Sequence, residues 1–211
     1  MNYQTLLNNA VNKLKSNSII NPGLDSELLL SKVLHTTREK LLLNLAKKTT
    51  SQEKKKFDLV IEKRSRKKPL AYILGNKEFW KTNFVVNDSV LIPRPDTEIL
   101  VEEALNHIKV DRQYQILDIG TGSGCILISV LKDRKKSKGI GIDISKNAIH
   151  NAKTNAKIQQ LENRIKFIHS DIDKFYGIKY DLILSNPPYI SRSNLKRLSE
   201  DIRNYEPILA L

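Results

Sequence analysis

The chain carries at residues 115–124 the stretch Gln115-Ile116-Leu117-Asp118-Ile119-Gly120-Thr121-Gly122-Ser123-Gly124. Its first half is a short apolar run typical of a buried strand, and an apolar helical pattern follows the glycines as far as Leu131. A glycine-rich turn between a strand and a helix is where α/β sheets bind ligands, because a Cβ there would hold the ligand away from the backbone. The stretch therefore predicts an α/β fold with a ligand site at the end of this strand.

The spacing of the glycines limits the kinds of ligand that the turn can bind. They fall at alternate positions, 120, 122 and 124. A dinucleotide fingerprint would place its third glycine at position 125, which is Cys125, and a phosphate-binding P-loop would continue with Gly-Lys-Ser or Gly-Lys-Thr, which does not follow here. The turn therefore favours a smaller ligand without a pyrophosphate.

Downstream of the turn, the sequence alternates strand and helix patterns. Apolar runs at residues 139–144, 165–169 and 180–185 predict three more strands, and Ser145 is placed to cap the helix after the first of them. Strands that alternate with helices are joined by right-handed crossovers and form a parallel sheet. We therefore expect four parallel strands with helices packed on them.

Acidic residues stand at the ends of two of these strands. Asp143 can accept hydrogen bonds from both hydroxyls of a ribose, and Asp171 from an adenine amino group. Either aspartate alone reads equally well as a helix cap or a surface carboxylate. Together with the glycine turn, at successive strand ends, they indicate a nucleoside ligand. The arrangement resembles class I methyltransferases, and this resemblance implies that the ligand is S-adenosylmethionine.

The segment Ser185-Asn186-Pro187-Pro188-Tyr189 follows the strand at 180–185, which we expect beside the strand at 115–119. An amide or exocyclic amine nitrogen is a poor nucleophile, because its lone pair is delocalised. The Asn186 side-chain carbonyl and the Pro187 backbone carbonyl can accept its two N–H groups and hold it in line with a sulfonium methyl group. The prolines stiffen the loop, and Tyr189 offers a face for a flat group to stack on. We predict methylation of a planar nitrogen, in either a nucleic-acid base or a protein glutamine.

The first 75 residues indicate short helices. Thr50-Ser51-Gln52-Glu53 fits a capping box, and the helix that it opens carries Phe57 and Ile61 on its inner face. Short strands are expected at residues 79–80 and 84–86, around a turn at 81–83. Asp96 is placed to cap the helix that follows.

Several longer motifs resemble the bacterial release-factor glutamine N5-methyltransferases, the HemK/PrmC family. The resemblance runs from near the N-terminus to Leu211. It is carried by these segments: Pro69-Leu70-Ala71-Tyr72-Ile73-Leu74-Gly75, Glu78-Phe79-Trp80, Leu91-Ile92-Pro93-Arg94-Pro95-Asp96-Thr97-Glu98, the glycine turn, residues 185–190, and Tyr205-Glu206-Pro207. The segment at 91–98 is far more specific to this family than Asn-Pro-Pro-Tyr, so it favours a protein glutamine over a nucleic-acid amino group.

The resemblance implies a domain order and a reaction. A five-helix domain that docks the substrate (1–75) and a hairpin linker (76–90) precede a Rossmann-like class I S-adenosylmethionine-binding domain (91–211). The implied substrate is the glutamine of the Gly-Gly-Gln motif of peptide chain release factors. The implied cofactor residues are Gly120, Thr121, Gly122, Ser123, Gly124, Asp143, Asp171, Ile172 and Asn186. The glutamine would be held by Asn186, Pro187, Pro188 and Tyr189, of which Asn186, Pro187 and Tyr189 are the expected catalytic residues.

Two departures from the family pattern are visible. At Ile172 some relatives place an aromatic residue against the adenine; isoleucine can still pack on the ring, so we expect an altered affinity. Relatives also continue past the Glu-Pro pair with further strands and helices, whereas this sequence stops at Leu211. We therefore expect a C-terminally truncated catalytic domain whose fourth strand forms an exposed edge.

The charge composition bears on which functions remain possible. Lys and Arg number 36 against 23 Asp and Glu, and residues 1–90 hold 17 of the former and 8 of the latter. This basic half could attract nucleic acid, but solvated basic helix faces explain it equally well, since no basic-aromatic motif accompanies it. Three functions stay open: a release-factor methyltransferase, an N6-adenine or rRNA amino methyltransferase, and a nucleoside-binding protein without turnover.

No cofactor other than S-adenosylmethionine is indicated. The single cysteine, Cys125, excludes an internal disulfide and reads as a small core residue. The histidines show no metal-ligand spacing: His35, His107, His150 and His169. No apolar run is long enough for a bilayer, and the N-terminus lacks a signal-peptide pattern. We therefore expect a cytoplasmic monomer with release factors as partners, no metal, no membrane contact and no requirement for nucleic acid.

Overall fold

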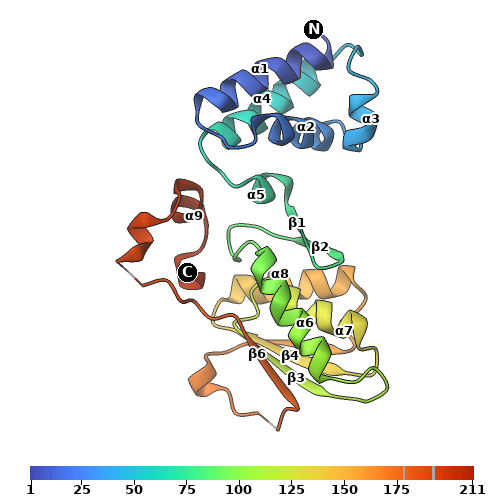
Figure 1. Cartoon of the computed structure of the whole chain (residues 1–211), viewed down its shortest axis with the longest axis vertical. Helices are drawn as coiled ribbons and strands as arrows, with labels where there is room; N and C mark the ends of the chain where they lie inside the picture. Colours follow the sequence, from blue (N-terminus) through green and yellow to red (C-terminus); the bar gives the residue numbers. More distant parts are fainter. Residues whose placement is uncertain (178, 192) are drawn as a thin grey trace. The chain divides into compact units, whose positions relative to one another are not determined.

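The structure is a computed structural model, and it describes residues 1–177, 179–191 and 193–211 of the chain. The chain divides into two compact units (Figure 1): residues 1–74 with 200–202, and residues 75–199 with 203–211. In the described part of the chain, no helix is both long and apolar enough to cross a membrane.

The first unit is built from helices that surround an apolar core. Leu14, Leu29 and Phe57 are almost completely buried at its centre. The predicted capping box is present: Thr50 Oγ1 accepts the N–H of Glu53 at 3.1 Å, and a Glu53 carboxylate oxygen accepts the N–H of Thr50 at 2.7 Å. The helices are α1 (Tyr3–Ser16), α2 (Pro22–Val33), α3 (Arg38–Leu42), α4 (Ser51–Ser65) and α5 (Leu70–Leu74).

A β-hairpin opens the second unit, formed by β1 (Asn76–Phe79) and β2 (Thr82–Val85). The expected turn was placed one residue too late, because Trp80 lies in the turn with φ 51°. Two contacts with helices of the same unit hold it there. The Trp80 N–H donates to the Glu98 carboxylate at 2.7 Å, and the indole N–H donates to the Asp133 carboxylate at 3.2 Å.

A short 3₁₀ helix, η1 (Pro95–Thr97), leads into α6 (Glu98–His107). The expected cap at Asp96 is wrong: Asp96 lies exposed within η1, and Thr97 takes the N-cap position of α6 without a side-chain capping bond. The following sheet is parallel throughout, in the order β5-β4-β3-β6. Its strands are β3 (Gln115–Ile119), β4 (Lys138–Asp143), β5 (Ile165–His169) and β6 (Leu182–Ser185).

The helices α7 (Cys125–Asp133) and α8 (Lys146–Ile158) lie between successive strands, and Ser145 caps α8 as expected, accepting the N–H of Ala148 at 3.2 Å. Glycines let the apolar helix and strand surfaces approach closely. A Cβ on Gly139 would stand 2.6 Å from the Leu127 side chain, and one on Gly141 2.6 Å from the Phe167 ring. The helical first unit and the parallel α/β second unit confirm the predicted fold class.

The strand β6 is an edge of this four-stranded sheet, as expected. Its Ile183 side chain is 58% exposed. The segments after β5 and β6 are η2 (Ile172–Lys174), η3 (Asn194–Arg197), α9 (Glu200–Tyr205) and η4 (Ile208–Ala210). The last of them returns to the loop after β6, where the Ile190 N–H donates to the carbonyl of Leu211 at 2.8 Å.

Candidate functional site

A cavity of about 300 Å³ lies in the second unit, where the parallel strands end at their carboxyl termini. This is the edge at which α/β sheets bind ligands. The carboxyl ends of all four strands contribute to its wall: Gly120, Thr121, Gly122 and Ser123 after β3, Asp143 at the end of β4 and Ile144 after it, Asp171 and Ile172 after β5, and Asn186 and Pro188 after β6. The cavity therefore joins the predicted nucleoside residues to the predicted catalytic loop.

The glycine turn exposes backbone to this cavity. Gly120 and Gly122 have φ values of 71° and 54°, which side chains with a Cβ rarely adopt. A Cβ on Gly120 would meet no atom within 4 Å, so the space beside it is open to a ligand. Gly124 differs, because a Cβ there would stand 3.1 Å from both Ile128 and Phe167, in the core. It does not line the cavity, and its part in cofactor binding stays a prediction from the resemblance.

Asp118 lies fully buried beneath this turn. The hydroxyl of Thr121 donates to its carboxylate at 2.6 Å. Burial raises the pKa of Asp118 to about 7, and the nearby charge of Asp143 acts in the same direction, whereas the Thr121 hydrogen bond opposes the shift. Asp118 therefore exchanges a proton near neutral pH while it supports the floor of the site.

Asp143 connects β4 to the glycine turn. One of its carboxylate oxygens accepts the Gly122 N–H at 2.9 Å, and the other accepts the Ser145 N–H at 2.8 Å. A carboxylate oxygen has a second lone pair, so both can still accept a hydroxyl from a ligand. The predicted ribose contact fits this geometry, although no sequence pattern indicated that Asp143 also holds the turn.

Asp171 and Ile172 form the wall after β5. A carboxylate oxygen of Asp171 accepts the Asp173 N–H at 3.1 Å and so caps η2, which is the structural role that its position also allowed. Ile172 is 46% exposed beside it and presents apolar surface. The pair offers an acceptor and an apolar surface, as the predicted adenine contact requires.

Only part of the loop after β6 lines the cavity. Ser185 fastens it to the neighbouring strand, donating to the Ile119 carbonyl at 3.0 Å. Asn186 is half-buried in the wall, and its side-chain NH₂ donates to the Thr97 hydroxyl at 3.2 Å. Pro188 lines the cavity, but Pro187 and Tyr189 do not, and Tyr189 is 81% exposed. The roles of Pro187 and Tyr189 toward a substrate stay predictions.

One part of the wall was not foreseen from the sequence. Residues around Arg94 and Pro207 complete the cavity, and the buried carboxylate of Glu206 binds the Arg94 guanidinium at 2.5 Å and the Ile92 N–H at 3.2 Å. Both segments were visible as family motifs, but their pairing across the chain was not. The signal that could have found it is the combination of a lone arginine and a lone glutamate, each beside proline, in two apolar segments.

Comparison with known proteins agrees with this arrangement. The model of the PrmC N-terminal domain matches residues 5–75, and the model of the Methyltransferase small domain matches residues 96–202. A release factor glutamine methyltransferase from Buchnera aphidicola is 40% identical over 211 residues, which cover 100% of this chain and 75% of the relative. The chain belongs to the release factor glutamine methyltransferase family.

Other family relatives are longer. A release factor glutamine methyltransferase from Fusobacterium nucleatum is 40% identical over 98% of this chain, and the match covers 59% of the relative. A protein named bifunctional methyltransferase from Rickettsia typhi is 40% identical over 98% of this chain, and the match covers 43% of that protein. The chain thus spans about half the length of these two relatives.

The remaining candidates for chemistry are metal-ligating side chains and the single cysteine. Among the described residues, no group of three His, Cys, Asp or Glu side chains is placed to hold a metal ion. Cys125 is buried in the core, as predicted, and burial raises the pKa of its thiol to about 12. The thiol is therefore neutral at physiological pH and a poor nucleophile.

Proposed function

We propose that this family member transfers a methyl group from S-adenosylmethionine to the side-chain nitrogen of the glutamine in the Gly-Gly-Gln motif of peptide chain release factors. The observation that carries the proposal is the shared cavity: the glycine turn and Asp143 line one part of its wall, and Asn186 lines another. A nucleoside cofactor and a planar amide can therefore meet in one site. The names of the Buchnera and Fusobacterium relatives support the same reaction.

The residues present fit the cofactor. Gly120 leaves open space at the turn, Asp143 retains acceptor capacity for ribose hydroxyls, and Ile172 offers apolar surface for a ring. When bound, S-adenosylmethionine supplies an electrophilic methyl group on its sulfonium centre. The side chains and the backbone of this chain would bind and orient the two reactants.

The loop after β6 would orient the glutamine amide. The Asn186 side-chain carbonyl and the Pro187 backbone carbonyl accept the two N–H groups of the amide, which favours pyramidal geometry at its nitrogen as positive charge develops there. The nitrogen gains the methyl group, with formation of a nitrogen–carbon bond and cleavage of the sulfur–carbon bond, and releases one proton to solvent. Tyr189, 81% exposed in this loop, offers its ring to the approaching flat group.

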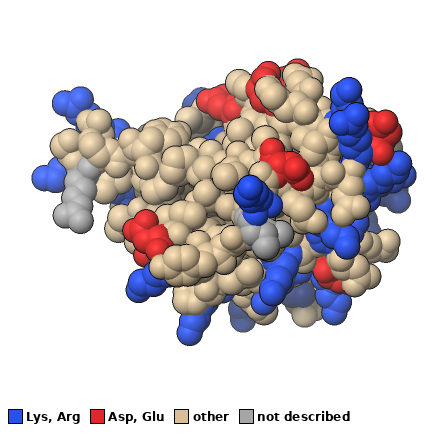
Figure 2. Space-filling view, turned by 90° about the horizontal axis from the view of Figure 1, so that it is seen from below, with Lys and Arg blue, Asp and Glu red and all other residues tan. Residues whose placement is uncertain are grey.

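Methylation of a nucleic-acid amino group is the alternative that the loop chemistry also allows. Its support is the net charge of +13. On the face drawn in Figure 2, however, Lys and Arg side chains lie mostly toward the rim, with a broad uncharged area and scattered Asp and Glu between them. A phosphate backbone is better matched by a continuous basic stripe. Release factors remain the favoured partner because the names of the relatives specify them, and the cytoplasmic location and the monomeric state belong to the same proposal.

A labelling experiment tests these readings. The chain is incubated with methyl-labelled S-adenosylmethionine and, in parallel, with a release factor, with a release factor whose Gly-Gly-Gln glutamine is replaced by alanine, and with ribosomal RNA. Label on the intact release factor but not on its alanine variant supports the proposal. Label on RNA supports the alternative, and cofactor binding in calorimetry without transfer to either substrate supports a binding protein.

A further inference from the structure

Asn186 has a partner in the cavity wall that holds its side chain in one orientation. Its Nδ2 donates to the hydroxyl of Thr97 at 3.2 Å, although the two residues lie 89 positions apart. Both residues line the same cavity. Thr97 ends η1 and stands directly before α6, whereas Asn186 follows β6. The contact therefore crosses from the entry of a helix to the end of a strand.

This contact decides which end of the Asn186 amide faces a substrate. A primary amide has one carbonyl that accepts and one NH₂ group that donates. With the NH₂ group on Thr97, the carbonyl is turned away from Thr97 and is free to accept an N–H from the glutamine amide. The opposite orientation would set the NH₂ group of Asn186 against the NH₂ group of the glutamine, where neither can accept.

Thr97 is itself well anchored. Its N–H donates to the Arg94 carbonyl at 3.0 Å, and the Arg94 guanidinium binds the buried carboxylate of Glu206. The same carboxylate accepts the Ile92 N–H, so Glu206 ties down the segment from two points. Pro93, between these points, and Pro95, directly after Arg94, restrict the backbone of the segment. A hydroxyl on such a support can fix the rotation of another side chain.

We propose that Thr97 is a positioning residue for methyl transfer: its hydroxyl accepts the Asn186 NH₂ group and thereby presents the Asn186 carbonyl to the nitrogen that receives the methyl group. This role rests on the proposed function, since it concerns the same site. The role concerns the part of the cavity that receives the substrate and not the part that binds the cofactor. Thr97 acts on the nitrogen acceptor through Asn186 and is not expected to contribute to cofactor affinity.

The test compares two substitutions at Thr97. Thr97→Val keeps the shape of the side chain but removes the hydroxyl, and Thr97→Ser keeps the hydroxyl. We expect Thr97→Val to lower kcat for the release factor about three- to tenfold, the range that corresponds to one hydrogen bond, and Thr97→Ser to restore it to within about twofold of the unchanged chain. The dissociation constant for S-adenosylmethionine, measured by calorimetry, should change less than about twofold in both.

A matched control makes the same chemical change elsewhere. Thr154→Val removes a hydroxyl that donates to the His150 carbonyl at 3.0 Å on α8, outside the cavity wall. It should leave kcat unchanged. Unchanged kcat in Thr97→Val, or a loss that Thr97→Ser does not restore, would overturn the proposal, and so would a loss matched by Thr154→Val.

A second readout does not depend on turnover. In ¹⁵N–¹H spectra of the chain, the side-chain NH₂ resonances of Asn186, assigned with Asn186→Ala, should shift in Thr97→Val and return toward their original position in Thr97→Ser. If the Asn186 NH₂ resonances stay at the same position in both variants, the contact with Thr97 does not exist. If the unchanged chain labels no release factor, the proposed function fails, while the spectra still decide whether Thr97 holds Asn186.

Discussion

The carboxylate of Glu206 binds the guanidinium of Arg94 at 2.5 Å across 112 positions of sequence. The Glu206 side chain is 1% exposed and that of Arg94 is 34% exposed. One residue lies just before the end of the chain and the other between two prolines at the entry of α6. The pair therefore joins two segments that meet only in the folded second unit, and both segments line the cavity.

We expect Glu206→Gln to destabilise the second unit. Glutamine keeps the size of the side chain but loses its charge and one of the two oxygens, which accept from Arg94 and from the Ile92 N–H respectively. Since the pair is partly exposed on the arginine side, the cost should be about 1–3 kcal/mol, below that of breaking a fully buried pair. Urea unfolding followed by the fluorescence of Trp80, which lies in this unit, measures the change.

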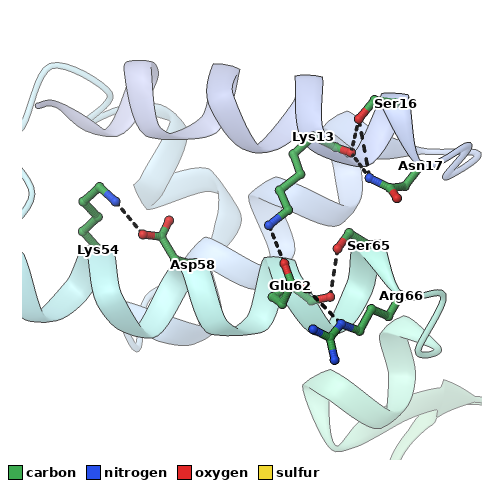
Figure 3. A network of polar contacts seen from close by, with 8 residues as sticks. All are labelled: Lys13, Ser16, Asn17, Lys54, Asp58, Glu62, Ser65 and Arg66. Atoms are coloured by element: carbon green, nitrogen blue, oxygen red, sulfur yellow. Dashed lines mark hydrogen bonds and ion pairs between the residues drawn. The ribbon is translucent and has the colours of Figure 1, made fainter.

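The first unit offers a matched control. Lys13 on α1 binds Glu62 on α4 at 2.5 Å, and Arg66 donates to the same carboxylate at 2.9 Å (Figure 3). Hydrogen bonds from these two cations lower the pKa of Glu62, but the side chains are exposed to solvent, where screening weakens ion pairs. Since Trp80 lies in the other unit, this control is followed by circular dichroism, and Glu62→Gln should change stability less than Glu206→Gln. Equal effects would show that burial does not distinguish the two pairs.

Gly141→Ala should disturb the sheet beneath the site. Its new methyl group would stand 2.6 Å from the Phe167 ring and 2.8 Å from the Thr121 hydroxyl, so the glycine turn or the ring must move. We expect a loss of stability of about 1–3 kcal/mol, measured by urea unfolding, and weaker binding of S-adenosylmethionine, measured by calorimetry. Gly23→Ala is the control: it adds a methyl group with no neighbour within 4 Å, inside α2, where alanine should be neutral or stabilising.

Asp118 should make stability fall as the pH rises from about 4 to about 7. The pKa of Asp118 is raised from 3.8 to about 7 by burial, so between these values the folded chain binds a proton that the unfolded chain has lost. The proton-linked stabilisation is complete below pH 4 and is lost as the pH passes 7, by at most about 4 kcal/mol. Asp118→Asn cannot ionise and can still accept the Thr121 hydroxyl. Denaturant unfolding at pH 5 and pH 8 should show a smaller decrease in the variant; an equal decrease would contradict this role.

Local patterns were sufficient to predict most of the sheet. The strands β3 and β5 lie at the predicted residues, because each is a short apolar run bounded by polar residues or glycine. The strand β6 begins two residues later than expected, and directly before it Asp181 pairs with Gln115, a residue distant in sequence: its N–H donates to the Gln115 carbonyl at 2.9 Å and its carboxylate accepts the Gln115 N–H at 2.7 Å. The turn at Trp80 was misplaced for a related reason: its partners, Glu98 and Asp133, are distant in sequence.

In the candidate site, too, local patterns predicted the residues but not their distant contacts. Gly120, Asp143 and Asn186 could be chosen from the sequence, since each follows or ends a strand and parallel strands end at one edge. The contacts that fix the geometry of these residues could not be predicted from the sequence. The hydrogen bond from Asn186 to Thr97 depends on how α6 packs beside β6, and no periodicity or spacing records a pairing of that kind.

Asn186→Ala should separate catalysis from cofactor binding. The substitution removes the side-chain carbonyl proposed to accept the glutamine N–H, whereas the Pro187 backbone carbonyl and the residues of the glycine turn remain. We expect kcat for release-factor methylation to fall about 100-fold, the effect typical of losing one well-placed hydrogen bond to a reacting group, with the dissociation constant for S-adenosylmethionine changed less than about threefold. Asn194→Ala, at an exposed position in η3, is the matched control and should retain full activity. If Asn186→Ala turns over like the unchanged chain, its carbonyl does not hold the reacting nitrogen, and the mechanism proposed for this loop is wrong.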